Sequence, residues 1–424
     1  DYCDNDVISE EAVYIERRQD FVAREILTNL SGLSMNHTTQ QHTARIIFGK
    51  EKNPQSHFVY TNLAEQFPTY NYELGKSTYL GEEPGEGGYV YAEPGMYSNV
   101  AVLDVASMHP TSIEELNLFG PYTQNFSDLK AARVAIKRKK YDDAKKMLGG
   151  VLEPYLDDVK NAEALSYALK IVINIVYGLT SAKFPNPFKD PRNIDNIVAK
   201  RGALFMIDLK KAVQQEGFQV IHIKTDSIKI PNATPAIINF VMKFGKNYGY
   251  DFEHETTYEK MCLVNDAVYI AKEIDAPWEG GGDGKWSATG AQFAHPYVFK
   301  TLFSHEQIEF KDMCETKSVT TALYLDFDAE KPMFEVNTPT TPQFVGKVGS
   351  FCPIKAGCGG GLLLREKEGK FYAASGTKGY FWMESEMVQQ LGKEKDIDKS
   401  YFTKLVDDAT SSIAKYGDVE WFLS

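Results

Sequence analysis

The sequence predicts a mixed α/β protein, and three stretches carry that prediction. Apolar residues 100–103 form a strand pattern that ends at Asp104, and a long helical pattern covers about 160–180. Alternating isoleucines on both sides of Thr225 and Asp226 indicate a β-hairpin with these two residues at its turn. Asp is common in turns for local hydrogen-bonding reasons, so the hairpin alone favours an ordinary turn residue.

Length and composition set the class of protein. The chain has 424 residues, which predicts two to four subdomains, and its 43% hydrophobic content is ordinary for a globular protein. We find neither an apolar run of 18 residues nor a signal peptide, so we expect no membrane partner. Five scattered cysteines argue against a disulfide scaffold and favour a reducing, cytoplasmic location.

The net charge of −12 argues against general binding of nucleic acid through positive charge. The local distribution is different, since residues 130–146 hold eight basic side chains and only two acidic ones. A solvated helix face is the usual explanation of such a run, and a phosphate-binding face is the alternative.

Three motifs, in the same order as in the family, resemble those of family B DNA polymerases. Residues 104–113, DVASMHPTSI, resemble motif A (D-x-x-S-L-Y-P-S-I-I). Residues 170–178, KIVINIVYG, resemble motif B (K-x-x-x-N-S-x-Y-G), and residues 224–227, KTDS, resemble motif C (D-T-D-S). The resemblance implies a right-hand polymerase fold, with a palm of antiparallel sheet plus helices, helical-hairpin fingers and a thumb.

The resemblance also implies a division of the chain into segments. We expect the C-terminal end of an exonuclease-like domain at 1–40, a linker and N-terminal segment at 41–98, and palm at 99–120 and 183–296. Fingers are expected at 121–182, with helices over about 128–148 and 160–180. A thumb is expected at 297–424, with a small β element within 345–382. A further helix over 192–216, stopped by Gly217, and strands at 262–264 and 267–270 are predicted from the pattern.

Site residues follow from the resemblance, position by position. Asp104 and Asp226 are the expected catalytic residues and hold two Mg²⁺ ions, with the Val105 carbonyl as a third ligand and Mn²⁺ as an accepted substitute. The nucleotide is expected at Ser107, Met108, His109, Arg133, Lys137, Lys170 and Asn174. Primer–template DNA is expected at Gly87, Gly88, Tyr177, Lys224 and Tyr269.

The chain departs from the family pattern at several positions. Lys224 replaces the first Asp of motif C, and Ile175 replaces the Ser of motif B. The positive charge of Lys224 could pair with Asp226 and compete with metal, or contact primer phosphate. His109 replaces the motif A Tyr, so it is either a looser gate against ribonucleotides or a packed residue at the strand exit. We expect Pro110 to end regular strand pairing within motif A.

Tyr2 and Asp6 match the Y-x-x-x-D motif of DnaQ-like 3′–5′ exonucleases, and a chance Tyr and Asp at a helix start is the alternative. The remaining carboxylates of such a nuclease are missing from this sequence, so we expect only the tail of that domain here. The Gly87–Gly88 pair loosely resembles the Y-x-G-G template contact, with Gly85 in place of the Tyr, and a plain linker explains it as well. Tyr269 falls at the family's K-x-Y segment, with Ala267 in place of the Lys.

Template-directed DNA synthesis is the predicted function, with deoxynucleotides and primer–template DNA as substrates. A separate exonuclease domain or chain and a processivity factor are further expected partners. A catalytically silent polymerase relative that binds DNA or a replication partner is the alternative, and Lys224 is its main support. A reverse transcriptase or RNA polymerase shares the two palm aspartates but lacks K-x-x-x-N-x-x-Y-G on a helix.

Overall fold

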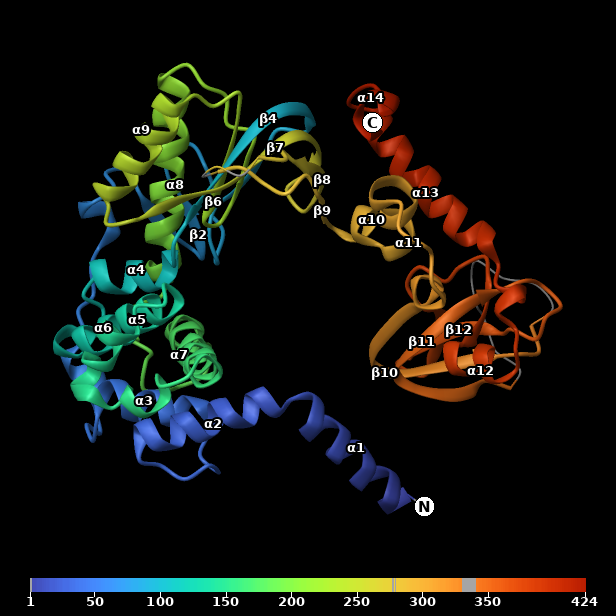
Figure 1. The fold of residues 1–424 in the computed structure, drawn as a ribbon, viewed down its shortest axis with the longest axis horizontal. Helices are drawn as coiled ribbons and strands as arrows, with labels where there is room; N and C mark the ends of the chain where they lie inside the picture. Colours follow the sequence, from blue (N-terminus) through green and yellow to red (C-terminus); the bar gives the residue numbers. More distant parts are fainter. Residues whose placement is uncertain (1, 277, 279, 330–340) are drawn as a thin grey trace. The chain divides into compact units, whose positions relative to one another are not determined.

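The structure is a computed structural model that describes residues 2–276, 278, 280–329 and 341–424 (Figure 1). Positions outside these ranges fall in the segments expected as exonuclease tail, palm and thumb. The chain forms two compact units: residues 1–91 with 103–254, and residues 92–102 with 255–424. The fold is mixed α/β, with twisted antiparallel sheets.

The first unit begins with two consecutive helices, α1 (Tyr2–Glu16) and α2 (Arg18–Ser31). Helix α3 (Thr39–Phe48) follows, and Thr38 and Gln41 form a capping box at its start. Short elements lead onward: the 3₁₀ turns η1 (Pro54–His57) and η2 (Leu63–Glu65), and the hairpin of β1 (Asn71–Glu73) and β2 (Lys76–Thr78).

The basic segment after motif A forms a shorter helix than predicted. After α4 (Met108–Glu115) and η3 (Gly120–Tyr122), α5 runs from Thr123 to Lys137, and α6 is a separate turn at Tyr141–Lys145. The predicted helix over 128–148 is therefore wrong at both ends. The observed helix starts earlier, at Thr123, and it ends earlier because Lys139 adopts a left-handed φ of 58°. The buried face of α5 consists of Thr123, Phe126, Leu129, Ala132, Ala135 and Ile136.

The second predicted helix of this region is present as α7 (Val159–Thr180), which follows η4 (Met147–Gly150) and η5 (Glu153–Tyr155). Asp158 caps it by accepting a 2.9 Å hydrogen bond from the Asn161 N–H. Helix α7 packs against α2 and α5. By length and composition it could cross a membrane, but half of its apolar window is buried in the protein, as in a core helix.

Helix α8 (Ile197–Gln215) leads into the sheet of the first unit, where the strands lie in the order β3, β5, β6, β4. These strands are β3 (Val90–Ala92), β5 (His222–Lys224), β6 (Ser227–Pro231) and β4 (Gly95–Val105), and α9 (Pro235–Lys246) follows them. Gly217, with φ 85°, stops α8 as predicted. Ile194 was expected on this helix, but it precedes the helix and is 71% exposed.

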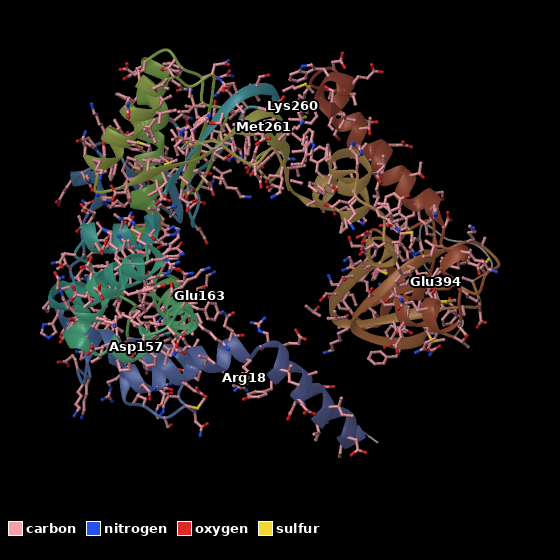
Figure 2. All side chains as sticks on the ribbon, viewed as in Figure 1. Arg18, Asp157, Glu163, Lys260, Met261 and Glu394 are labelled. Carbon is pink, nitrogen blue, oxygen red and sulfur yellow. The ribbon has the colours of Figure 1, made fainter. Side chains whose placement is uncertain are left out.

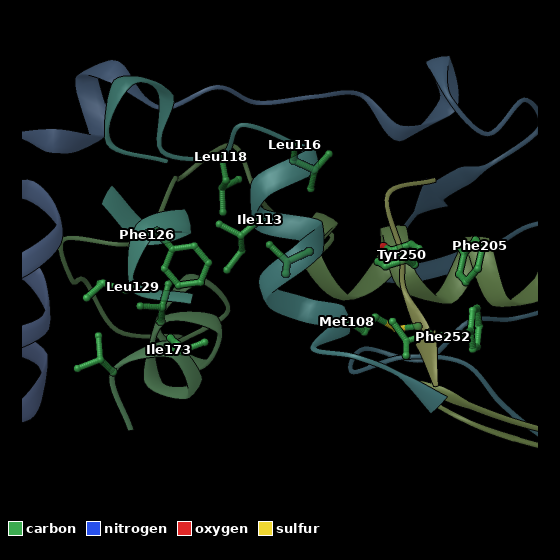
Figure 3. Close-up of a cluster of buried hydrophobic side chains, with 14 of the residues drawn as sticks. Met108, Ile113, Leu116, Leu118, Phe126, Leu129, Ile173, Phe205, Tyr250 and Phe252 are labelled. Atoms are coloured by element: carbon green, nitrogen blue, oxygen red, sulfur yellow. The ribbon is translucent and has the colours of Figure 1, made fainter. Parts of the chain in front are cut away.

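Helix α4 connects two parts of one large core (Figure 3). Its Ile113 packs toward Phe126 of α5, together with Leu118 beyond the helix end, and Met108 at its start lies near Phe252. Charged side chains such as Arg18 and Glu163 stand on the outer faces of α2 and α7 (Figure 2). The core therefore holds α4, and with it the segment after Asp104, in a fixed position.

The second unit contains two antiparallel arrangements. Strands β7 (Phe252–Asn265), β8 (Val268–Glu273) and β9 (Trp286–Thr289) pair in sequence order, so the two strands predicted near 262–270 are confirmed and longer. A five-stranded sheet has the order β13, β12, β10, β11, β14 and includes the predicted β element. Its strands are β10 (Glu315–Asp326), β11 (Gln343–Ile354), β12 (Leu362–Lys367), β13 (Lys370–Ala373) and β14 (Phe381–Glu384).

Short helices complete the second unit: α10 (Ala291–Ala294), α11 (Pro296–Phe299), the π-helical turn η6 (Lys300–Ser304), η7 (Phe310–Met313), α12 (Ser385–Gln390), η8 (Glu394–Asp396), α13 (Lys399–Ala414) and α14 (Val419–Leu423). The buried Lys260 of β7 donates to the Trp421 carbonyl at 3.1 Å (Figure 2). Met96 packs so closely that a Cβ on Gly417 would lie 2.5 Å from its sulfur. Residues near 96 and near 417 therefore belong to one core.

Candidate active site at the ends of two strands

The structure brings the two predicted aspartates to one place in the first unit. Asp104 is the second-last residue of β4. Asp226 lies in the turn between β5 and β6, and β6 is the strand that neighbours β4. The Val105 N–H donates to the Asp226 carbonyl at 2.9 Å, so the backbones of the two segments are bonded. Both carboxylates are half-buried. Neighbouring strand ends thus hold two acidic groups that are 122 positions apart in the sequence.

The hairpin that carries Asp226 has a rigid tip. Its pairs are His222↔Lys229, Ile223↔Ile228 and Lys224↔Ser227, as the alternating isoleucines predicted. Thr225 has a left-handed φ of 59°, and its N–H donates to the Tyr89 carbonyl at 2.9 Å. A left-handed Thr costs about 1–3 kcal/mol and persists only where its surroundings enforce it.

The electrostatic surroundings of Asp226 differ from the sequence expectation. Burial raises its pKa, while its own backbone N–H, His109 and Lys229 act in the opposite direction. Lys224 is exposed, and within the described ranges no ion pair joins it to Asp226, so the first of its two possible roles is not observed. Lys229 was missed, although a lysine between Ile228 and Ile230 in a buried strand is a recognisable signal; it is only 3% exposed.

Helix α4 starts directly behind Asp104. Ser107, at its N-cap, has a left-handed φ of 61°, and its side chain does not cap the helix. Pro110 occupies the first turn, where its fixed φ is favourable and no N–H is needed. Strand β4 ends at Val105, so strand pairing does not extend through Pro110, as expected. Met108 faces the core, and a Cβ on Gly202 would lie 2.5 Å from its sulfur. Met108 could therefore reach a ligand only through its backbone.

His109 joins motif A to motif B. Its ring stacks on that of Tyr177, with 3.9 Å between centroids and 5° between planes. Burial lowers the pKa of His109, against the charge of Asp226 and a hydrogen bond with the Gly87 backbone, which raise it. Its Nε2 atom is buried and has no hydrogen-bond partner. A neutral imidazole with one open ring nitrogen thus lies within the influence of Asp226.

The glycine segment before β3 is a fixed part of this site. A Cβ on Gly88 would lie 3.0 Å from Thr225 Cγ2, whereas the exposed Gly87 has open space around it. Lys200 of α8, which is 3% exposed, donates to the carbonyls of Pro84 (3.1 Å) and Gly85. Sequence reasoning missed Lys200, because a lysine in a helix is normally solvated.

Helices α5 and α7 carry the predicted nucleotide-binding side chains. Lys170, Asn174 and Tyr177 share one face of α7, and the first two are exposed. Arg133 of α5 is half-buried, burial lowers its pKa, and its Nε has no partner. Lys137 is exposed at the end of the same helix. The two helices pack together, and the convergence of these cations on one ligand stays a prediction.

A pocket of about 690 Å³ lies beside the Tyr177 ring. Its wall includes Lys183, Lys189 and Lys200, together with the buried carboxylate of Asp195. Asp195 accepts a 2.9 Å hydrogen bond from the Tyr70 hydroxyl at Oδ2, and its Oδ1 has no partner. The pocket thus offers both positive charge and an open acceptor. Gly87 and Asn196 also line it.

Three predicted residues lie elsewhere in the chain. Tyr269 belongs to the second unit, where it pairs with Leu263 and Thr289 on neighbouring strands. Tyr2 and Asp6 lie on α1, and Asp6 is exposed. Over the described ranges, no cluster of three or more His, Cys, Asp or Glu side chains could hold a metal, so Asp6 has no acidic partners of that kind.

The residues at Asp104 and Asp226 fit a magnesium site of a particular type. Mg²⁺ is commonly held by one or two carboxylates together with substrate phosphates and water, and not by an all-protein cage. Two half-buried aspartates on bonded strand ends match that donor set. The raised pKa of Asp226 reflects a buried charge that a cation would stabilise.

Comparisons with known proteins give a likeness to solved structures. No protein-family model matches the sequence, and no curated protein does. The structure resembles that of the family B DNA polymerase from the hyperthermophilic archaeon Pyrobaculum calidifontis, with a TM-score of 0.46 and 13% sequence identity. The likeness covers 94% of this chain and 54% of that one, so the chain spans about half the length of the archaeal protein.

Proposed function

We propose that this chain catalyses template-directed DNA synthesis, adding deoxynucleotides to a primer 3′ end. The observation that supports this most is the pair Asp104 and Asp226, held on bonded strand ends beside the His109–Tyr177 stack. Three motifs that lie far apart in the sequence are thereby neighbours in space.

Each group at this site has a role in the proposed reaction. Asp104 and Asp226 hold Mg²⁺, with Mn²⁺ as a substitute and the Val105 carbonyl as an added ligand. When bound, such ions stabilise the attacking and leaving oxygens of an in-line displacement. Backbone N–H groups at Ser107, Met108 and His109 hold phosphate oxygens at the start of α4, where N–H groups have no helical partner.

Cations of the two packed helices complete the nucleotide site. Lys170 and Asn174 on α7, with Arg133 and Lys137 on α5, neutralise the triphosphate as negative charge develops on the leaving pyrophosphate. The buried, unpartnered Nε of Arg133 supports this role, because a buried donor without an acceptor in the protein is costly.

The template strand is assigned to the pocket beside Tyr177. The Tyr177 ring gives a base a stacking surface, and the lysines of the pocket wall neutralise phosphates. Gly87 and Gly88 let the backbone approach the DNA closely. DNA contacts of Lys224 and Tyr269, a processivity factor, a separate exonuclease and a cytoplasmic location remain predictions.

The direct test is primer extension by the purified chain in Mg²⁺, with each nucleotide type and with DNA and RNA templates. We expect extension with deoxynucleotides on DNA, and its loss in Asp104→Asn and Asp226→Asn with primer–template affinity retained. Substantial extension by either variant would show that these carboxylates are not catalytic.

A catalytically silent DNA-binding relative is the second candidate. The exposed Lys224, in place of an acidic residue of the family motif, favours it. This candidate predicts primer–template binding without extension in wild type, and no recovery of activity in Lys224→Asp. Extension by wild type excludes it.

A further inference from the structure

Two thiols of the second unit face each other across a strand pair. Cys314 directly precedes β10, and Cys352 lies in β11, where Glu315 pairs with Phe351. Continuing this register by one residue places Cys314 opposite Cys352. Their sulfur atoms are 3.5 Å apart, and both cysteines are free. Directly opposed residues of an antiparallel pair have Cα atoms about 4.5–5.5 Å apart, within the roughly 4.4–6.8 Å that a disulfide spans.

The two sulfurs differ in access and acidity. Cys314 is half-buried and Cys352 is fully buried. The hydrogen bond with Cys352 lowers the pKa of the Cys314 thiol, against the effect of burial, and Ser350 adds to the lowering. The same contact and burial raise the pKa of Cys352. The thiolate therefore forms on the sulfur that an external reagent can reach.

We propose that Cys314 and Cys352 are a reversible oxidation site that takes hydrogen peroxide as its oxidant. The Cys314 thiolate attacks one peroxide oxygen, the O–O bond breaks, and hydroxide leaves. The sulfenic acid that forms on Cys314 is then attacked by the Cys352 sulfur. An S–S bond forms, the S–O bond breaks, and the oxygen leaves as water with the proton of Cys352. Two thiols are oxidised, and one peroxide is reduced to two waters.

The covalent link would fix the end of η7 to the middle of the five-stranded sheet. In the reduced protein the Cys314 thiol lies 3.3 Å from the Phe310 carbonyl, and the adjacent Glu315 binds His295 (2.7 Å) and Lys317 (3.2 Å). A link at this position closes the loop between 314 and 352, which reduces the freedom of the unfolded chain. We therefore expect the oxidised second unit to unfold at a higher temperature. The inference is independent of the proposed polymerase activity.

The test uses the full chain, fully reduced, freed of reductant and treated with hydrogen peroxide. Remaining thiols are then blocked with N-ethylmaleimide in denaturant, and the chain is digested with trypsin without reduction. Lysines at 311, 317, 347 and 355 place Cys314 in peptide 312–317 and Cys352 in peptide 348–355. We expect these two peptides to be joined and to separate on adding dithiothreitol. The exposed Cys3 reports that oxidant reached the protein.

Variants separate the two steps. Cys352→Ser should retain a Cys314 sulfenic acid that dimedone traps, and Cys314→Ser should give neither product. The half-buried Cys358 lies in the same unit, so Cys358→Ser is the matched control and should keep the link. Recovery of 312–317 and 348–355 as separate alkylated peptides from wild type, while Cys3 is oxidised, would overturn the proposal. Linkage of Cys314 to a different cysteine would do the same.

Discussion

Replacing Asp226 with Asn should stabilise the first unit while abolishing activity. Burial raises the pKa of Asp226, so the folded state disfavours the carboxylate that is present at neutral pH. Each unit of such a shift corresponds to about 1.4 kcal/mol. Lys229 offsets part of this cost, so we expect a gain in the free energy of unfolding within the range of single stabilising substitutions, about 0.5–2 kcal/mol.

The sign and range of the pH dependence follow from the same shift. When a carboxyl group has a raised pKa in the folded state, the folded protein loses stability as the pH rises from the ordinary pKa of the group through its folded value. The gain in the free energy of unfolding of Asp226→Asn over wild type should therefore be absent below about pH 4 and increase as the pH rises toward 7.5. For a unit of this size, 1 kcal/mol raises the melting temperature by about 2–4 °C.

The assay measures the unfolding of the first unit by urea and by heat, without Mg²⁺ and at several pH values. Asp251→Asn is the control, because that carboxylate is exposed and pairs with Lys246 on the surface, where such pairs contribute little. Adding Mg²⁺ should stabilise wild type and leave Asp226→Asn unchanged. A destabilised Asp226→Asn at pH 7.5 would refute the reasoning, because the ionised carboxylate would then be a structural requirement.

Four further predictions concern the same site and α1. Gly88→Ala should destabilise the protein by about 1–3 kcal/mol, because its Cβ would meet Thr225. Gly87→Ala, with open space around its Cβ, is the control for stability, and equal unfolding midpoints of the two variants would contradict this. Lys170→Ala should lower kcat/KM for nucleotides with unchanged primer–template affinity, and the reverse pattern would indicate a DNA-binding face. His109→Ala should raise ribonucleotide relative to deoxyribonucleotide incorporation at least about tenfold, or ~1.4 kcal/mol, and an unchanged kcat/KM ratio would indicate packing only. Labelled single strands should stay intact with the chain in Mg²⁺, and 3′–5′ shortening that Asp6→Ala abolishes would contradict this.

Elements that depend only on residues close together in the sequence were predicted from local patterns. The alternating isoleucines around Asp226 predicted the hairpin and its register, and Gly217 predicted the end of α8. The end of α5 was missed because a left-handed Lys139 breaks a run of good helix formers. Pro110 indicated that strand pairing does not extend through this position, but the helix around it was not predicted, because proline suits a helix start as well as a strand end.

The site was predictable only where a motif marks it. Asp104, Asp226, His109 and Tyr177 were found from their motifs, and the structure places them together. The supporting lysines could not be found in this way. Lys200 acts on backbone carbonyls more than a hundred positions away, and no local pattern encodes such a partner.

The interleaving of the two units has a consequence for synthesis on the ribosome. Residues 92–102 belong to the second unit, and Met96 packs near Gly417. At about 5–20 residues per second, this early segment waits for roughly tens of seconds before its partners emerge. During that interval its apolar side chains are available to chaperones. For the same reason, a truncation after His254 would keep every residue of the first unit but leave residues 92–102 without the rest of the second unit, 255–424.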